Sequence, residues 1–344
     1  MFTRHPNNPL IKPRDVKPSR SDFEVIGAFN AGATTYNGEL LLLLRVAERP
    51  IRSENTIIPC PYLDDHGDLV LKQVRSDDPN YNTRDSRLIV DKRSGEVWLT
   101  SLSHLRLARS VDGVHFAIDE RPWLQGEPPY ETFGMEDARI SRIEGKYFVN
   151  YTAVSPNGIA TALASTRDFV QIERHGLIFA PQNRDVTIFS KKIGGQYICY
   201  HRPMPSGLGR LNIWLATSPD LIHWGELSIV LDSRVAGRTG GGAPPIRTEQ
   251  GWLSIYHAAD ANQRYTLGAF LTPLDQPGRI IARSREPIFA PEQPYETSGF
   301  FGNVVFTCGA IVDGDNLRLY YGASDETTAL AEASLNEVIR SLQS

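Results

Sequence analysis

Cysteine is scarce in this chain of 344 residues, which contains only Cys60, Cys199 and Cys308. Their odd number and wide spacing exclude the disulfide framework of a small secreted domain. We interpret them as reduced thiols in or near a core, and we expect a cytoplasmic protein. The start, Met1–Pro6, has no apolar signal-peptide core, which agrees with that expectation.

Long apolar runs and an excess of one charge are also missing. No apolar run reaches membrane-spanning length, and Leu40–Leu44 is typical of a strand. The 36 basic and 40 acidic residues give a net charge of −4, which argues against nucleic-acid or membrane partners. Motifs for zinc, for a nucleotide or for an acyl-transfer serine are absent, so we predict no metal and no cofactor.

What the chain does contain is a repeated unit. A Gly-rich or polar start is followed by an apolar strand, a turn and a second strand that ends in aromatic or aliphatic residues. The five starts are 29–33, 134–138, 183–187, 240–244 and 300–304, and the turns are Asn37-Gly38, 144–146, 194–196, 249–251 and 313–315. Such Gly-containing turns are hairpin signals.

The spacing of these units predicts the architecture. The last four turns begin at residues 144, 194, 249 and 313, which are 50, 55 and 64 residues apart. The first gap, from 37 to 144, is longer and predicts an insertion between about Val46 and Leu105. A third strand with an Asp-containing turn follows in at least three units, and four-stranded repeats indicate a propeller more often than a sandwich. We therefore predict an all-β chain, a single five-bladed β-propeller domain over residues 1–344 with its active site at the central channel. A long β-sandwich is the alternative.

The stretch Gly134–Ile140 places Glu136, Asp137 and Arg139 side by side at the start of an alternating strand. Neighbouring side chains of a strand point to opposite faces, so we expect only one of the two carboxylates to face a given cleft. A single oriented carboxylate beside an arginine is used for proton transfer in sugar chemistry. The alternative is a surface Glu-Asp pair that closes a turn.

In a propeller the first strand of each blade lines the channel, so polar residues near the strand starts should converge at one mouth. The strand starts supply Asn30, Glu136, Asp137, Arg139, Arg184, Asp185 and Asn303, and the ends of second strands supply Arg45, His201, Arg202, His257, Asp260 and Asp325.

Several of these residues also have structural alternatives. Arg45 could cap a sheet, Arg184 could pair with Asp185 at the surface, and Asp325 could cap the C-terminal segment. His201 and His257 each follow a tyrosine at equivalent points of consecutive units. This favours a shared site over two ordinary half-buried histidines.

An ordered set of motifs resembles glycoside hydrolase family 130. The motifs are Gly134–Ile140 before a strand, Asn183–Asp185 with His201–Pro203, 240–245 with Tyr256-His257, and the supporting Asn30, Arg45 and Tyr320–Asp325. The resemblance runs from about residue 5 to 335. It implies a five-bladed propeller, in agreement with the repeats. Most members of the family are phosphorylases that cleave β-mannosides with inorganic phosphate, and a minority are β-mannoside hydrolases.

The resemblance also implies roles for particular residues. Asp137 would be the proton donor, and Arg184, Arg202 and His257 would bind phosphate. The other predicted substrate-binding residues are Asn30, Arg45, Glu136, Arg139, His201, Asp260 and Asp325.

We therefore expect an inverting phosphorylase that converts a β-mannoside to mannose 1-phosphate and a shortened acceptor, with β-1,2-linked mannobiose or mannooligosaccharide favoured over β-1,4 substrates. Its partners would be the mannoside and inorganic phosphate as co-substrate, with a homo-oligomer possible. A hydrolase of the same family would need a carboxylate base, for which Glu131, Asp260 and Glu296 are candidates. A glycosidase or fructosidase of another five-bladed family and a non-catalytic sugar-binding propeller are further alternatives.

Overall fold

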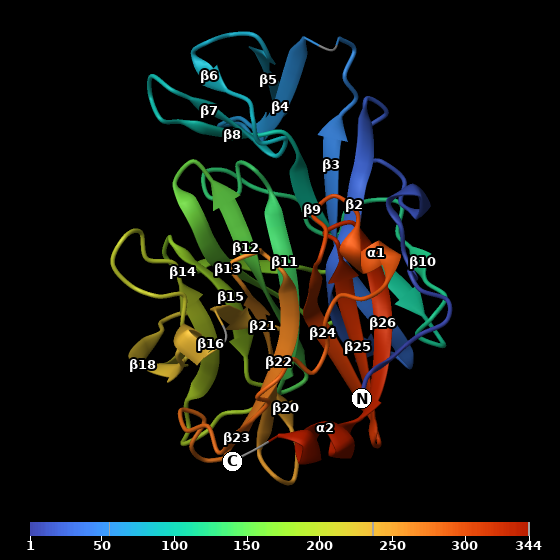
Figure 1. Ribbon diagram of the computed structural model, residues 1–344, viewed down its shortest axis with the longest axis vertical. Coiled ribbons are helices and arrows are strands. Elements are labelled where there is room, and N and C mark those ends of the chain that lie inside the picture. Colours follow the sequence, from blue (N-terminus) through green and yellow to red (C-terminus); the bar gives the residue numbers. More distant parts are fainter. Residues whose placement is uncertain (55, 236, 343–344) are drawn as a thin grey trace.

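The computed structural model describes residues 1–54, 56–235 and 237–342. Within them the chain is all-β, and its larger sheets follow one another along the sequence (Figure 1). The first sheet contains β2 (Phe23–Tyr36), β3 (Glu39–Pro50), β9 (Leu102–Ser110) and β10 (Ala117–Ile118). The second sheet contains β11 (Met135–Ile143), β12 (Lys146–Ser155), β13 (Gly158–Thr166) and β14 (Glu173–Phe179). The third sheet contains β15 (Asn183–Ile188), β16 (Tyr197–Pro203), β17 (Ile213–Ser218) and β18 (Gly225–Leu231).

The fourth and fifth sheets complete this series. The fourth contains β19 (Arg238–Gly241), β20 (Ile246–Arg247), β21 (Trp252–Ala259), β22 (Tyr265–Thr272) and β23 (Ala282–Arg283); the fifth contains β24 (Val305–Asp313), β25 (Asn316–Ala323), β26 (Thr327–Ser334) and the N-terminal β1 (Thr3–Arg4). The short helices are α1 (Pro294–Thr297), α2 (Leu335–Ser341) and the 3₁₀ turns Pro13–Asp15 and Ser233–Val235. No helix among the described residues is both long and apolar enough to cross a membrane.

The hairpin turns form as their residues predict. Asn37 and Gly38, between β2 and β3, both have positive φ angles of 49° and 82°. Positive φ at both central residues is the type I′ geometry, whose twist matches that of the flanking strands. Asn and Gly tolerate this region best, so the Asn-Gly dipeptide sets the register that pairs Tyr36 with Glu39.

A bulge interrupts the first strand of three consecutive sheets at the same point. Asn30, Asp137 and Asp185 have φ angles of 47°, 50° and 57°, and each lies where the pairing register shifts. A bulge adds one residue and re-aims its neighbours, and Asn and Asp are the residues other than Gly that best tolerate positive φ. At these bulges the side chains no longer alternate strictly between the two faces of the strand.

The chain between β3 and β9 forms two small sheets of its own, at the top of Figure 1. They contain β4 (Ile57–Leu63) and β5 (Leu69–Arg75), and β6 (Tyr81–Asn82), β7 (Leu88–Asp91) and β8 (Val97–Leu99). β3 continues to Pro50 and β9 begins at Leu102, so this inserted segment covers residues 51–101, slightly less than the predicted 46–105. Trp98 contacts the residues just before the second sheet, since its ring lies 6.0 Å from that of Phe133.

The beginning of the chain is fixed to its end. β1 pairs with β26, so the N-terminal residues complete the fifth sheet. The Arg4 guanidinium donates to Glu296 at 2.7 Å and 2.9 Å, and the Tyr321 hydroxyl donates to the same carboxylate at 2.7 Å. Glu296 is fully buried, so these bonds compensate for its lost hydration and hold α1 against the fifth sheet.

Candidate active site

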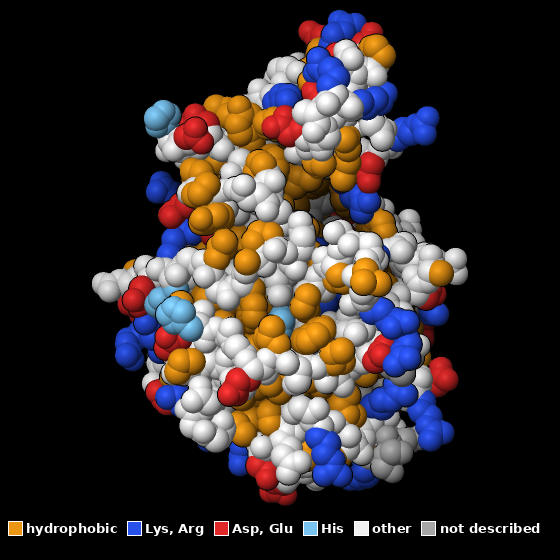
Figure 2. All heavy atoms as spheres, turned by 90° about the vertical axis from the view of Figure 1, so that its left-hand side faces the viewer, with side chains coloured by type: hydrophobic (Ala, Val, Ile, Leu, Met, Phe, Trp, Pro, Cys, Tyr) orange, Lys and Arg blue, Asp and Glu red, His pale blue; other side chains and the backbone are white. Residues whose placement is uncertain are grey.

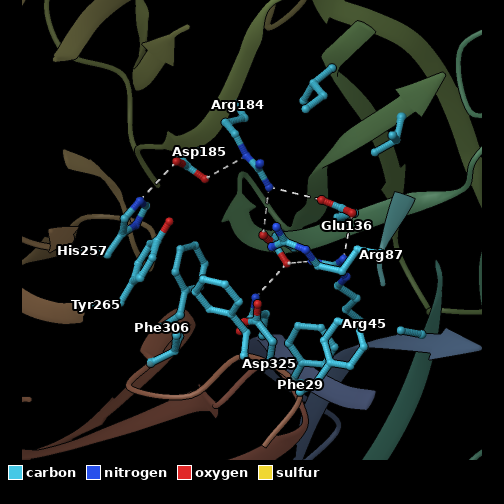
Figure 3. A pocket seen from close by; sticks show the side chains of 18 of the residues that line it. Phe29, Arg45, Arg87, Glu136, Arg184, Asp185, His257, Tyr265, Phe306 and Asp325 are labelled. Carbon is cyan, nitrogen blue, oxygen red and sulfur yellow. Dashed lines mark hydrogen bonds and ion pairs between the residues drawn. The ribbon is translucent and has the colours of Figure 1, made fainter. Parts of the chain in front are cut away.

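A cavity of about 640 Å³ lies where the first strands of the sheets meet the inserted segment (Figure 3). Its wall contains most of the residues predicted for the site: Asn30, Arg45, Glu136, Asp137, Arg184, Arg202, His257 and Asp325. They come from all five sheets or the turns beside them, so the structure brings these predicted residues of the strand starts and second-strand ends together.

Asp137 faces this cavity and is almost completely buried, with 2% of its surface exposed. Its Oδ1 accepts hydrogen bonds from Asn30 Nδ2 at 2.9 Å and Arg45 Nη1 at 3.1 Å, and its Oδ2 lies 3.5 Å from Arg184 Nη2. Burial raises the pKa of Asp137, but the guanidinium groups of Arg45, Arg184 and Arg139 outweigh burial and hold that pKa below its ordinary value. These guanidinium groups therefore favour the ionised form of Asp137.

Glu136 lines the cavity beside Asp137, which corrects the expectation that only one of the two would face it. Its Oε1 accepts from Arg45 Nη2 at 2.7 Å, and its Oε2 accepts from Arg184 Nη2 at 3.2 Å. The bulge between Glu136 and Arg139 is the reason, because Asp137 at positive φ breaks the alternation of side chains. Arg45 and Arg184 thus each connect both carboxylates.

Asp185 is the centre of the cationic part of the cavity. Its Oδ2 lies 2.9 Å from Arg202 Nη2 and 3.3 Å from His257 Nε2, and Arg184 Nε lies 3.8 Å from its Oδ1. Burial raises the pKa of Asp185, but Arg202 and His257 hold it well below its ordinary range. The Arg184–Asp185 pair is therefore part of the buried cavity wall, which excludes the surface ion pair considered as an alternative.

Arg139 lies beneath the cavity instead of on its wall. Its guanidinium donates to the backbone carbonyls of Asp137, Gly241 and Gly242 at 2.8–3.1 Å, and to Asp185 Oδ1 at 3.4 Å. It therefore connects the bulges that carry the two aspartates. The geometry gives it a positioning role, whereas direct contact with the sugar was predicted.

The structure does not bring His201 to the cavity. Its Nδ1 is 2.9 Å from Asn183 Nδ2, its ring stacks on Phe179 at 4.6 Å, and burial lowers its pKa to about 4. Tyr200 and Tyr256 pack in one core cluster between the third and fourth sheets, so the two Tyr-His pairs use opposite faces of their sheets.

Asp260 is also outside the cavity. It is exposed, and its Oδ1 accepts the backbone N–H groups of Asn262 and Arg264, so it stabilises the turn between β21 and β22. The position gives no support to the predicted contact with substrate.

Several cavity residues were not predicted as site residues. Asp185 appeared among the strand starts, and its match in position to Asp137 was a signal that could have identified it. Arg238 donates to the Tyr265 hydroxyl at 2.8 Å on the cationic side, and the Arg45 guanidinium lies 4.8 Å from the Phe29 ring. Arg87, Phe300, Phe301 and Phe306 also line the cavity.

The described residues contain no group of three or more His, Cys, Asp or Glu side chains arranged to hold a metal ion. Independence from metal remains a prediction, which activity in the presence of a chelator can test.

Comparison with known proteins gives the family. Residues 86–344 match the sequence model of glycoside hydrolase family 130, described as beta-1,4-mannooligosaccharide phosphorylase. A beta-1,2-mannobiose phosphorylase of Listeria innocua is 48% identical over 99% of this chain and 98% of its own length. A 1,2-beta-oligomannan phosphorylase of a Thermoanaerobacter species is 36% identical over 69% of this chain and 80% of its own length.

Solved structures agree with this result. The Listeria innocua enzyme in complex with beta-1,2-mannobiose superimposes with a TM-score of 0.95 at 46% identity, covering 99% of this chain and 98% of that one. A family 130 structure described with glycoside hydrolases that target beta-1,2 mannosidic linkages in Candida mannan is 24% identical, covers 98% of this chain and 94% of that one, and has a TM-score of 0.74, so it shows the fold alone. From its sequence match and its structure, the chain belongs to glycoside hydrolase family 130.

Proposed function

We propose that the protein is an inverting β-mannoside phosphorylase that converts β-1,2-mannobiose or short β-1,2-mannooligosaccharides to mannose 1-phosphate and a shortened acceptor. The named phosphorylase relatives support this reaction class, and the near full-length Listeria innocua relative supports the linkage. The observation that carries the proposal is the division of the cavity between the Glu136–Asp137 carboxylates and a cationic cluster, defined here as Arg184, Arg202 and His257.

The cationic cluster has hydrogen-bonding capacity that the protein does not use. Arg184 Nε, Arg202 Nε and His257 Nδ1 are buried without a hydrogen-bond partner among the described residues. A buried donor left without a partner costs roughly 1–3 kcal/mol, so such donors indicate a ligand. A phosphate dianion offers acceptor oxygens that suit guanidinium groups in particular.

The chemistry follows from this placement. A phosphate oxygen attacks the anomeric carbon of the terminal mannose, and the bond from that carbon to the glycosidic oxygen breaks. Asp137 gives its proton to the leaving oxygen, directly or through a sugar hydroxyl, and ends as a carboxylate. Phosphate is already an anion, so no carboxylate base is needed to activate it.

Asp137 must acquire a proton before it can donate one. In the empty site, burial opposes the Arg45, Arg184 and Arg139 guanidinium groups, which nevertheless keep its pKa low. A phosphate dianion bound by Arg184 competes for that guanidinium and adds negative charge, and both effects raise the pKa of Asp137. Phosphate binding therefore prepares the acid that the reaction uses.

The remaining polar residues of the wall suit a sugar. Asn30 and Arg45 donate to Asp137 and keep it oriented, and Glu136 and Asp325 offer acceptors for sugar hydroxyls. Phe29 and Phe306 also line the wall, but both rings are largely buried and are covered by the Arg45 guanidinium and the His257 ring, respectively. This arrangement supports Asn30, Arg45, Glu136 and Asp325 as sugar-binding residues.

The hydrolase alternative lacks its predicted base. Glu131 accepts hydrogen bonds from Tyr151 at 2.7 Å and Arg174 at 2.8 Å, Glu296 is held by Arg4, and Asp260 caps an exposed turn. The three lie outside the cavity wall.

We also infer that the five larger sheets are the blades of a propeller. β2 packs beside β24 and β11, and β15 packs beside β11 and β19, so the first strands follow one another around a common centre. The pairing of β1 with β26 supports closure between the two ends of the chain. The single domain, the cytoplasmic location and a homo-oligomer stay predictions.

Product analysis tests the proposed function. The protein is incubated with phosphate and one mannoside at a time: β-1,2-mannobiose, β-1,4-mannobiose or mannosyl-glucose. The sugar phosphate that forms is detected by phosphorus NMR. We expect mannose 1-phosphate mainly from the β-1,2 substrate. A protein that binds these sugars but converts none of them would instead be a sugar-binding propeller.

A further inference from the structure

The inserted segment forms part of the cavity wall. Arg87, Leu88, Leu99 and Ser101 line the cavity from this segment, and Phe300 and Phe301 line it from the loop after α1. The Arg87 guanidinium lies 5.2 Å from the centre of the Phe301 ring, so the two segments meet at the cavity. Phe300 remains 38% exposed, which leaves an apolar ring face accessible.

Arg87 is held in place while part of its guanidinium stays available. Its Nε and Nη2 donate to the two oxygens of Asp85 at 3.0 Å and 2.8 Å, and its backbone N–H donates to Asp85 at 2.9 Å. No hydrogen bond from Nη1 is formed with the described residues. A donor fixed in advance loses little entropy on binding, so it is suited to recognition.

Arg87 and the cationic cluster occupy different parts of the cavity. Figure 3 shows His257 and Asp185 on one side of the labelled group and Arg87 on the other. Asp137 accepts hydrogen bonds from both Arg45 and Arg184. The hydrogen-bonded Asp85 is the main cause that raises the pKa of Arg87, and Asp325 of the cavity wall contributes. Arg87 and Asp325 line the same cavity.

We propose that Arg87 is a specificity-determining residue that binds the acceptor sugar of the mannoside. This inference rests on the proposed phosphorylase function. The terminal mannose must lie beside Asp137 and the phosphate, so the acceptor lies towards the inserted segment. There the Arg87 Nη1 donors meet hydroxyl oxygens of the acceptor, and the Phe300 and Phe301 rings cover an apolar face of the sugar.

The chain contains a matched control. Arg93, in the same inserted segment, donates to both oxygens of Asp91 at 3.0 Å and 2.7 Å, so it has the same Asp-x-Arg pairing. Arg93 does not line the cavity. Replacing either arginine by methionine removes one Asp-x-Arg ion pair, although Asp91 is more buried than Asp85. Only Arg87→Met removes a donor from the cavity.

The test measures synthesis from mannose 1-phosphate with mannose or β-1,2-mannobiose as acceptor. We expect Arg87→Met to raise KM for the acceptor roughly tenfold or more, the scale of one lost charge-assisted hydrogen bond, and to change KM for mannose 1-phosphate by less than about twofold. Arg93→Met should leave both constants unchanged. Arg87→Lys, which keeps the charge without the planar fork, should give an intermediate value and serves if the methionine variant does not fold.

Two results would overturn the inference. One is an acceptor KM in Arg87→Met equal to that of Arg93→Met, and the other is an equal rise in KM for acceptor and for mannose 1-phosphate. Both require an active wild-type enzyme. If the wild type shows no phosphate-dependent reaction with any mannoside, the proposed function itself has failed.

Discussion

The substitution Asp325→Asn should make the protein more stable at alkaline pH, and it should also lower the activity. Burial raises the pKa of Asp325; Arg45 opposes the shift and the neighbouring Asp137 and Glu136 carboxylates add to it, giving a value of about 6. The unfolded chain releases this proton near pH 4. The free energy of unfolding therefore falls as the pH rises from about 4 to about 6. Above that range Asp325 is ionised in both the folded and the unfolded chain, and the protein stays less stable by the full amount.

The magnitude follows from the shift of about two pKa units, which corresponds to at most about 3 kcal/mol. Asp325 is only partly buried, so roughly 1–3 kcal/mol is the expected range. At roughly 2 °C per kcal/mol for a chain of this size, Asp325→Asn should raise Tm by about 2–6 °C at pH 8 and by clearly less at pH 4.5. A charged group that costs stability yet persists in the cavity is expected of a functional residue.

Calorimetric unfolding of the wild type and the variant at both pH values provides the assay. Asp313→Asn, at the exposed turn between β24 and β25, is the control and should not change Tm. A variant that melts at or below the wild-type temperature at pH 8, or a gain that is equal at both pH values, would refute the reasoning.

Further predictions concern the reaction. Asp137→Asn should lower kcat by roughly 10²–10⁴-fold with Tm little changed, and near-normal turnover in a folded variant would contradict its role as acid. Arg184→Ala and His257→Ala should mainly raise KM for phosphate, about ten- to hundredfold, with a smaller effect on KM for the mannoside; if both variants instead lose Tm and keep the wild-type KM for phosphate, these residues are structural. Excess EDTA should leave kcat unchanged, and loss of activity that added metal restores would show a metal requirement.

The repeated hairpins could be predicted from the sequence because the residues of their turns are local signals. Asn37-Gly38 has few conformations other than a tight hairpin turn, and regular spacing of such turns indicates sheets of similar size. The convergence of Asp137, Arg184, Arg202 and His257 was also predictable, since equivalent points of successive sheets face a common centre.

The bulges were not predictable in the same way. A strand pattern has a period of two, and a single extra residue reverses which side chains face the cavity. For this reason Glu136 faces the cavity beside Asp137. His201 faces away because Tyr200 and Tyr256 pack in one core cluster, so the two Tyr-His pairs use opposite faces of their sheets. The signal was the aspartate or asparagine at each bulge, residues that tolerate positive φ.

The inserted segment held the other unpredictable feature. Arg87 reaches the cavity only because residues 51–101 fold over it and meet the loop that carries Phe301. Neither segment repeats elsewhere in the chain, so no internal comparison could reveal the contact. On the face shown in Figure 2, apolar side chains occupy much of the middle and most charged side chains lie towards the edges.

The most direct test is the phosphate dependence of β-1,2-mannobiose cleavage, followed with Asp137→Asn as the inactive control. We predict that one mannose 1-phosphate forms for each mannose released, and that almost no mannobiose is cleaved when phosphate is omitted. Release of free mannose from both halves of the disaccharide, at the same rate with and without phosphate, would contradict the phosphorylase account.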